Sequence, residues 1–150
     1  MNKFFELVSV MKLYEANFRN LHWNSAGEEF NDAHKDITTN YYELFADNID
    51  KVAEMMAMLD MNAPNYMDTV KILDECEKDY MVVDTSQFYN RKAIVDAADV
   101  MLNDVCILLA DVLQEACFED HINDGIKSEF ETVLYDFSLQ ARYINKRKLM

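Results

Sequence analysis

Glycine and proline are scarce in this chain of 150 residues, which has two glycines and one proline. These two residues mark most sharp turns, and the residues that dominate the rest of the chain tolerate helix well. The composition therefore predicts an all-α protein. Nothing in it changes along the chain to suggest a second unit, so we expect one domain over residues 1–150.

Basic residues are also few. There are 14 Lys and Arg against 28 Asp and Glu, which gives a formal net charge of -14. Binding to DNA depends on clustered Lys and Arg that neutralise phosphates, so the charge argues against DNA binding. The one basic cluster, Lys146 to Lys148, is expected to offset a helix dipole at the C-terminus. An acidic protein can instead attract cations.

Cysteine pairs and long apolar runs are missing as well. The three cysteines, Cys76, Cys106 and Cys117, are widely spaced and include no CxxC pair, which favours reduced thiols inside a cell. No stretch approaches the ~20 apolar residues of a membrane span, and the charged N-terminus does not resemble a signal peptide. We therefore expect a cytoplasmic protein with no membrane contact.

What is present is apolar periodicity of three and four residues. It predicts long helices over about 4–24, 30–61, 94–113 and 126–144, a short helix over 67–78, and a crossover over 79–90. Gly27 is expected to close the first helix, and Asn31 or Asp32 to cap the second. This order predicts a ferritin-like four-helix bundle whose long crossover carries a short helix between the second and third long helices.

Two of the three histidines, His22 and His34, lie twelve residues apart and are followed by Asp50 and Glu54. Imidazole and carboxylate together suit iron or another first-row transition metal. Each part also has a simpler explanation. A single histidine at the edge of an apolar face can be a hydrogen-bonded core residue, and the row Glu43, Asp47, Asp50 and Glu54 can be a solvated acidic flank.

On an ideal helix His34 and Asp50 point roughly 160° apart, because each residue turns by ~100°. They would then not share a metal within one chain. If both are ligands, we expect the site to be completed across a symmetric interface between two copies.

The residues around these histidines resemble those of the Dps proteins (DNA-binding proteins from starved cells), or mini-ferritins. The segment 20–34 is similar to that family's His-Trp-Asn, Gly, Phe and His pattern, here His22-Trp23-Asn24, Gly27, Phe30 and His34. The segment 48–54 is similar to its second, acidic pattern with Asp50 and Glu54. The resemblance is specific from about residue 13 to 60.

The resemblance implies a homo-oligomer, a hollow dodecamer, with ferroxidase sites shared at two-fold interfaces. Such sites oxidise Fe(II) with hydrogen peroxide or dioxygen and the cavity stores Fe(III). It implies that His22 and His34 come from one subunit and Asp50 and Glu54 from its partner. Trp23 would lie beside the site, to pass on electrons or simply to pack the interface. Zinc or manganese would also be accepted by such ligands.

Two positions depart from the family's pattern. The family has an acid four residues after the second histidine, where this chain has Thr38. The interval from His34 to Asp50 is also one residue longer. We expect a π-bulge within residues 38–42 to absorb that residue and restore the helical phase.

The departures suggest an alternative function, and the remaining acids suggest a further candidate site. The protein could be a structural or binding assembly with a degenerate metal site, as Thr38 suggests. Asp120 and Asp124, beside His121, match the turn where the family often places acidic pores through which iron enters, although a polar turn between helices is the simpler explanation.

Overall fold

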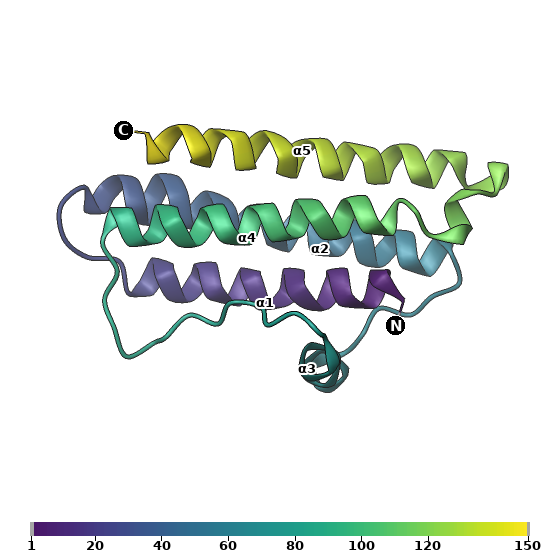
Figure 1. Cartoon of the computed structure of the whole chain (residues 1–150), viewed down its shortest axis with the longest axis horizontal. Coiled ribbons are helices and arrows are strands. Elements are labelled where there is room, and N and C mark those ends of the chain that lie inside the picture. Colours follow the sequence, from purple (N-terminus) through teal and green to yellow (C-terminus); the bar gives the residue numbers. More distant parts are fainter. Residues whose placement is uncertain (1, 150) are drawn as a thin grey trace.

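Four long helices lie side by side in the computed structural model, which describes residues 2–149 (Figure 1). They are α1 (Lys3–Trp23), α2 (Asn40–Met58), α4 (Arg91–Val112) and α5 (Asp124–Lys148). A π-helix, η1 (Asp32–Thr39), leads directly into α2. Residues 2–149 contain no β-strand, so the predicted all-α class is confirmed.

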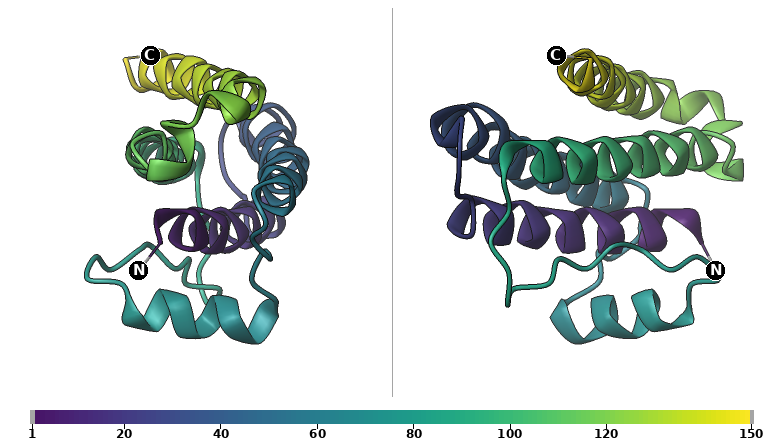
Figure 2. Two further views of the ribbon diagram at one scale, coloured as in Figure 1. Left: turned by 90° about the vertical axis from the view of Figure 1, so that its right-hand side faces the viewer. Right: turned by 60° about the vertical axis from the view of Figure 1, so that its left-hand side comes forward.

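The short helix α3 (Tyr66–Glu75) crosses the end of α1 on the outside of the four, as the end view in Figure 2 shows. The segment 76–90 then returns along α1, so that α2 and α4 run in the same direction (Figure 1). Two 3-10 turns, η2 (Ala116–Phe118) and η3 (His121–Asn123), join α4 to α5. The predicted short helix, the crossover and the break before the last helix are all present.

Asparagine side chains begin three of the helices. Asn2, Asn65 and Asn90 each have extended backbone and accept a hydrogen bond from a backbone N–H two or three residues further on. This satisfies one of the N–H groups that a helix leaves free at its start. The predicted cap of the second helix was wrong, because Asn31 is itself helical and its side chain makes no capping bond.

Gly27 has a φ of +92°, the left-handed conformation that was expected for it. It does not close α1, however, because that helix already ends at Trp23 and is capped by Asn24, whose N–H bonds to the carbonyl of Asn20. Gly27 instead turns the loop between α1 and η1, and a Cβ built there would meet Cβ of Asn90 at 3.7 Å. Glycine therefore serves the loop, since other residues rarely adopt this φ.

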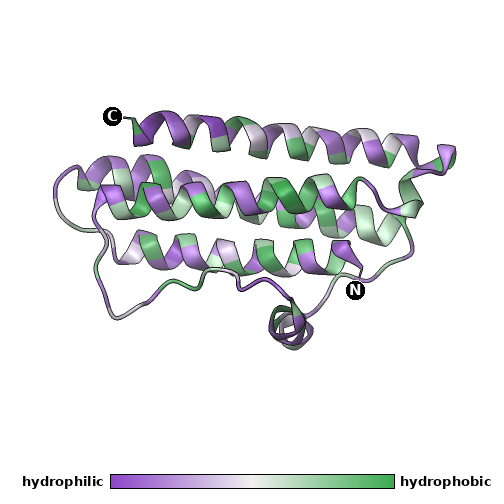
Figure 3. Ribbon diagram, viewed as in Figure 1, coloured by the Kyte–Doolittle hydropathy of each residue, from purple (hydrophilic) through white to green (hydrophobic). Residues whose placement is uncertain are grey.

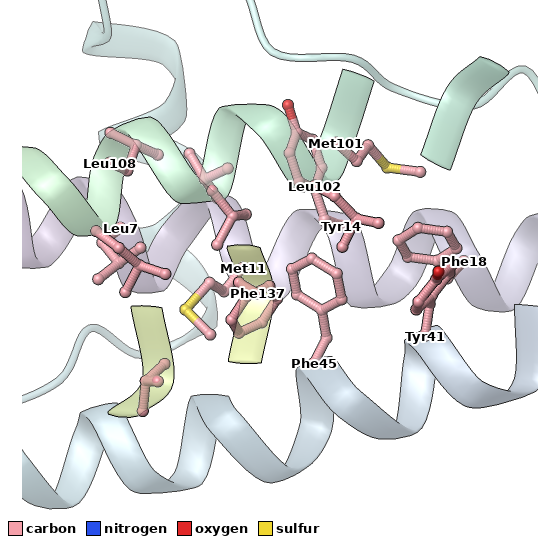
Figure 4. Packing of buried hydrophobic residues seen from close by; sticks show 14 of the residues in the cluster. Leu7, Met11, Tyr14, Phe18, Tyr41, Phe45, Met101, Leu102, Leu108 and Phe137 are labelled. Atoms are coloured by element: carbon pink, nitrogen blue, oxygen red, sulfur yellow. The ribbon is translucent and has the colours of Figure 1, made fainter. Parts of the chain in front are cut away.

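The core lies between the four long helices. Figure 4 shows side chains of α1, α2, α4 and α5 pointing into the same space, among them Tyr14, Phe45, Leu102 and Phe137, all fully or almost fully buried. Aromatic rings meet at T-shaped contacts, with Phe45 and Phe137 centroids 5.1 Å apart. The hydropathy colouring of the ribbon in Figure 3 shows apolar segments along α1 and α4 and a larger share of hydrophilic residues along α5.

One polar network crosses this core. The Tyr14 hydroxyl donates to Asp104 at 2.5 Å, and Lys78 of the crossover forms an ion pair with the other carboxylate oxygen. Asp104 is 8% exposed, so its charge needs these donors. Burial, followed by the bond to Asp104, raises the pKa of Tyr14 far above its ordinary value of about 10.

We predict that Tyr14→Phe lowers the free energy of unfolding by about 1–3 kcal/mol at pH 7, because a buried carboxylate loses a donor. The raised pKa keeps the phenol protonated in the folded state. Its contribution is therefore complete below the unfolded pKa of about 10 and is lost as the pH rises towards the folded pKa. Urea unfolding from pH 7 to 11 should show the gap between wild type and variant narrowing above about pH 10. A gap that stays constant to pH 11 would contradict this assignment.

Candidate metal centre

His22 and His34 lie face to face where the last turn of α1 meets η1. Their ring centroids are 3.8 Å apart and the rings are nearly parallel, with an angle of 14°. Both side chains are half-buried. Two residues from different helices are thus brought together as the sequence predicted for a shared ligand pair.

Each ring is fixed by the backbone carbonyl of the other histidine. Nδ1 of His22 lies 2.9 Å from the oxygen of His34, and Nδ1 of His34 lies 3.0 Å from the oxygen of His22. A carbonyl oxygen only accepts, so both Nδ1 atoms must carry the hydrogen. In the neutral rings the lone pair is then on Nε2, which is the arrangement of histidines that bind metals.

Hydroxyl groups surround the same two carbonyls. Thr38 and Thr39 donate to the oxygen of His34 at 2.8 and 2.9 Å, and Ser25 donates to the oxygen of His22 at 2.9 Å. The carbonyl of His34 thus receives bonds from two side-chain hydroxyls and an imidazole. Side-chain donors that compete for a helix carbonyl open the regular ladder of backbone bonds, which accounts for a π-helix at this position.

The predicted π-bulge is present as a π-helix, which overlaps the expected interval at Thr38 and Thr39. It spans Asp32–Thr39 and so begins six residues before the expected interval 38–42. A π turn takes up about one residue more than an α turn, which shifts the phase by ~100°. His34 and Asp50 therefore point within about 60° of one another. The rise of the helix still separates them by roughly 20 Å, so one chain cannot bring them together.

Aromatic rings enclose the pair. Phe30 stacks on the outer face of His34 with centroids 4.8 Å apart, and Tyr42 meets the ring of His22 edge-on at 5.4 Å. The Arg19 guanidinium lies over Tyr42 at 4.5 Å. Partial burial, together with the nearby His34 and Arg19, lowers the pKa of His22. A lower pKa favours the neutral imidazole that a metal requires.

The predicted carboxylate ligands are not near the histidines within one chain. Asp50 and Glu54 are exposed on α2, as are Glu43 and Asp47, so the four acids form a solvated flank of the single copy. Among residues 2–149 neither Asp50 nor Glu54 forms an ion pair. No group of three or more His, Cys, Asp or Glu is arranged to hold a metal within that same part of the chain.

The other predicted residues lie at the surface. Trp23 is 67% exposed at the end of α1, next to the histidine pair in the sequence. Asp120 caps η3 by accepting from the N–H of Ile122, and Asp124 lies 3.5 Å from Nδ1 of His121. Within one chain these two acids therefore build a polar turn, and their predicted role in a pore stays a prediction.

An ion-pair cluster holds the start of η1 against α4 and α5. Asp32 accepts from Arg91 at 2.7 Å and from Arg147 at 3.3 Å, and Arg91 also pairs with Glu29. Lys148 in turn pairs with Asp99 at 3.0 Å. Two of the three residues in the basic C-terminal cluster are thus engaged within the chain. Among the described residues no helix is both long and apolar enough to cross a membrane.

Sequence reasoning missed the hydroxyl groups. The sequence pattern indicates Thr38 only as the replacement of an acid and indicates no role for Ser25. The available signal was their spacing, since Ser25 follows His22 by three residues and Thr38 follows His34 by four. At those spacings a side chain can reach back to the carbonyl of the earlier residue.

Comparison with known proteins identifies similar folds. No protein-family model and no curated protein matches the sequence. The crystal structure of Helicobacter cinaedi CAIP is similar, with a TM-score of 0.79 at 20% identity, over 97% of this chain and 96% of that one. Antigen TpF1 from Treponema pallidum is also similar, with a TM-score of 0.53 at 18% identity, over 93% and 89%. At these identities the likeness is one of fold.

We predict that Asp32→Asn destabilises the end of the bundle that carries His34, because Arg91 and Arg147 lose their shared carboxylate. The cluster is partly exposed, so the expected loss is about 1 kcal/mol and should shrink at high salt. Hydrogen exchange should speed up in η1 and in the last turn of α5. Asp36→Asn is the matched control, since Asp36 is exposed in the same π-helix and forms no ion pair among residues 2–149. Equal exchange in the two variants would contradict the prediction.

Proposed function

We propose that this chain is a Dps-type mini-ferritin with a ferritin-like four-helix bundle, which binds Fe(II) as a substrate and oxidises it with hydrogen peroxide or dioxygen. Iron binds between His22 and His34 of one copy and Asp50 and Glu54 of a second copy. The observation that carries the proposal is the pair of reciprocal bonds from each Nδ1 to the other histidine's carbonyl. They leave two Nε2 lone pairs for a metal.

The donor chemistry supports iron. Neutral imidazole and carboxylate together suit Fe(II), and zinc or manganese would compete for the same ligands. The lowered pKa of His22 supports the neutral form. A histidine that serves only in packing has no reason to keep Nε2 free of partners. Here all the hydrogen bonds of both rings are made by Nδ1. This asymmetry favours ligands over core histidines.

The position of the acids supports sharing between copies. Asp50 and Glu54 are exposed, uncommitted to ion pairs in the described chain, and directed to the same broad side as His34 once the π-helix is counted. A two-fold axis on that side would place the acids of each copy near the histidines of the other and so create two equal sites. The exposed Trp23 ring would be covered by the same contact.

The reaction is an electron transfer in which the protein forms few covalent bonds. Two Fe(II) ions give one electron each to hydrogen peroxide, which takes up two protons and becomes two water molecules. Each histidine holds iron through its Nε2, and the partner's carboxylates balance the increasing positive charge. Tyr42 and Phe30 limit access of water to the imidazoles from their sides. The resulting Fe(III) would be stored within a dodecamer in the cytoplasm.

A structural or binding assembly without efficient oxidation is the second candidate. It is favoured by Thr38, which stands where the family has an acid and whose hydroxyl is already bonded to His34. DNA binding finds no support in the basic cluster, because Arg147 and Lys148 pair with acids of the same chain. DNA compaction is therefore not part of the proposal.

We predict that a His22→Ala/His34→Ala double variant oxidises Fe(II) no faster than buffer does. Protein loaded with Fe(II) without oxygen would be given hydrogen peroxide, and Fe(III) absorbance would be followed with time. His121→Ala is the matched control, since it removes an exposed histidine elsewhere and should keep the wild-type rate. A double variant as fast as wild type would refute the ferroxidase assignment, and a wild type no faster than buffer would favour the structural candidate.

We also predict that two inactive variants restore one another. His22→Ala/His34→Ala lacks the histidine half of each site, and Asp50→Asn/Glu54→Gln lacks the carboxylate half. In a mixed pair one of the two sites joins intact histidines to intact acids. Random reassembly of an equal mixture should therefore regain about one quarter of the wild-type sites. Light scattering would confirm that the mixture forms the wild-type particle. No regain in such particles would mean that the sites are not shared.

A further inference from the structure

Ser25 and Thr38 repeat one bonding pattern on the two histidines. The Thr38 hydroxyl donates to the carbonyl of His34 at 2.8 Å and lies 3.0 Å from Nδ1 of His22, the ring bonded to that same carbonyl. The Ser25 hydroxyl donates to the carbonyl of His22 at 2.9 Å and lies 3.1 Å from Nδ1 of His34. Each imidazole thus faces a carbonyl together with a hydroxyl bound to that carbonyl. His22 also faces a second, more distant hydroxyl, because Thr39 donates to the same carbonyl at 2.9 Å and lies 3.3 Å from Nδ1 of His22.

The direction of these hydrogen bonds determines which nitrogen of each ring carries the hydrogen. Each hydroxyl has one hydrogen, and that hydrogen is given to the carbonyl. The hydroxyl therefore offers only lone pairs to the neighbouring Nδ1. A ring with its own lone pair on Nδ1 would face two or more acceptors at about 3 Å, which buried groups avoid. The pattern selects the ring with hydrogen on Nδ1.

Burial and backbone hydrogen bonds fix the positions of both hydroxyls. Thr38 is fully buried, and Ser25 is 7% exposed. The backbone beside Ser25 is bonded to the crossover, with the N–H of Ala26 donating to Tyr89 and the N–H of Tyr89 donating to Asn24. The hydroxyl of Thr38 is directed inward at His22 and His34, and its hydrogen is committed to the carbonyl.

We propose that Ser25 and Thr38 are positioning residues that hold His34 and His22 with hydrogen on Nδ1, so that both Nε2 atoms are ready for a metal. The proposal rests on the function proposed above and deepens it. Thr38 does not replace the family's acid as a ligand. Its place is behind the ligand His22, and the carboxylates of the site come from the partner copy alone.

Two variants of Thr38 separate the hydroxyl from the volume of the side chain. Thr38→Val keeps the shape and removes the hydroxyl, whereas Thr38→Ser keeps the hydroxyl and removes a methyl group. Ser25→Ala removes the second hydroxyl. Thr132→Val is the matched control, because Thr132 donates to the carbonyl four residues earlier in the same way, on the exposed face of α5.

The first measurement uses the protein without metal. Solid-state ¹⁵N NMR of sedimented, histidine-labelled protein at pH 8 distinguishes hydrogen on Nδ1 from hydrogen on Nε2 whatever the particle size, and single alanine variants assign the signals. His22 and His34 should both carry hydrogen on Nδ1 in wild type and in Thr38→Ser. In Thr38→Val only the carbonyl of His34 and the more distant Thr39 hydroxyl still face Nδ1 of His22, so a fraction of His22 should change to the form with hydrogen on Nε2. Ser25→Ala should have the same effect on His34.

The second measurement is the affinity for Zn²⁺, a redox-inert probe, by calorimetry at the same pH. Groups behind a ligand typically change metal affinity by about 10–100-fold. We expect that loss in Thr38→Val and Ser25→Ala, and wild-type affinity in Thr38→Ser and Thr132→Val. Wild-type spectra or affinity in Thr38→Val would overturn the proposal, as would a loss in Thr38→Ser equal to that in Thr38→Val.

Failure of the proposed function would look different. If wild type and His22→Ala/His34→Ala bound Zn²⁺ equally, the shared metal site would be wrong. The spectra of the metal-free protein would then still show whether Ser25 and Thr38 hold hydrogen on the two Nδ1 atoms.

Discussion

The bonds that His22 and His34 exchange are the interaction on which the rest of this site depends. Each ring donates its Nδ1 hydrogen to the other residue's carbonyl, so the two rings stack with each Nδ1 facing the backbone of the other residue. The exchange joins the last turn of α1 to the π-helix across a short loop. It also decides which nitrogen of each ring a metal can meet.

The π-helix follows from the same interaction. A regular α-helix commits each carbonyl to the N–H four residues on, which would leave the oxygen of His34 poorly placed for an imidazole from α1. The bonds from Thr38 and Thr39 and the pairing of Asp32 with two arginines stabilise the wider turn. Segments that are distant in the sequence thus meet at one end of the bundle to hold a pair of rings.

Much of the fold was predictable from the sequence because apolar periodicity reports burial directly. Tyr14, Tyr41 and Phe137, for example, lie on the apolar faces predicted for three different helices, and all three are buried between the long helices. The longer interval before Asp50 indicated a π-helix that includes Thr38 and Thr39, but not its start at Asp32, which depends on side-chain bonds to the carbonyl of His34. The π-helix also changes the angle between His34 and Asp50 from that of an ideal α-helix, although the distance along the helix still keeps them apart.

The site was predictable only in part. The spacing of His22 and His34 marked them as a pair, because both lie near one end of neighbouring helices. The part played by Ser25 and Thr38 depends on the direction of hydrogen bonds, which a sequence does not encode in any simple pattern. The approach of Asp50 and Glu54 to the histidines depends on contact between copies, and the fold of a single chain does not contain that contact.

The most direct test of the shared site is anomalous diffraction from crystals of the assembled protein soaked with Fe(II) under anaerobic conditions. Data collected on both sides of the iron absorption edge locate the metal without assuming its ligands. We expect strong iron peaks within bonding distance of Nε2 of His22 or of His34, and of carboxylate oxygens from Asp50 and Glu54 of a second copy. Iron bound elsewhere, with both histidines free of metal, would contradict the proposal.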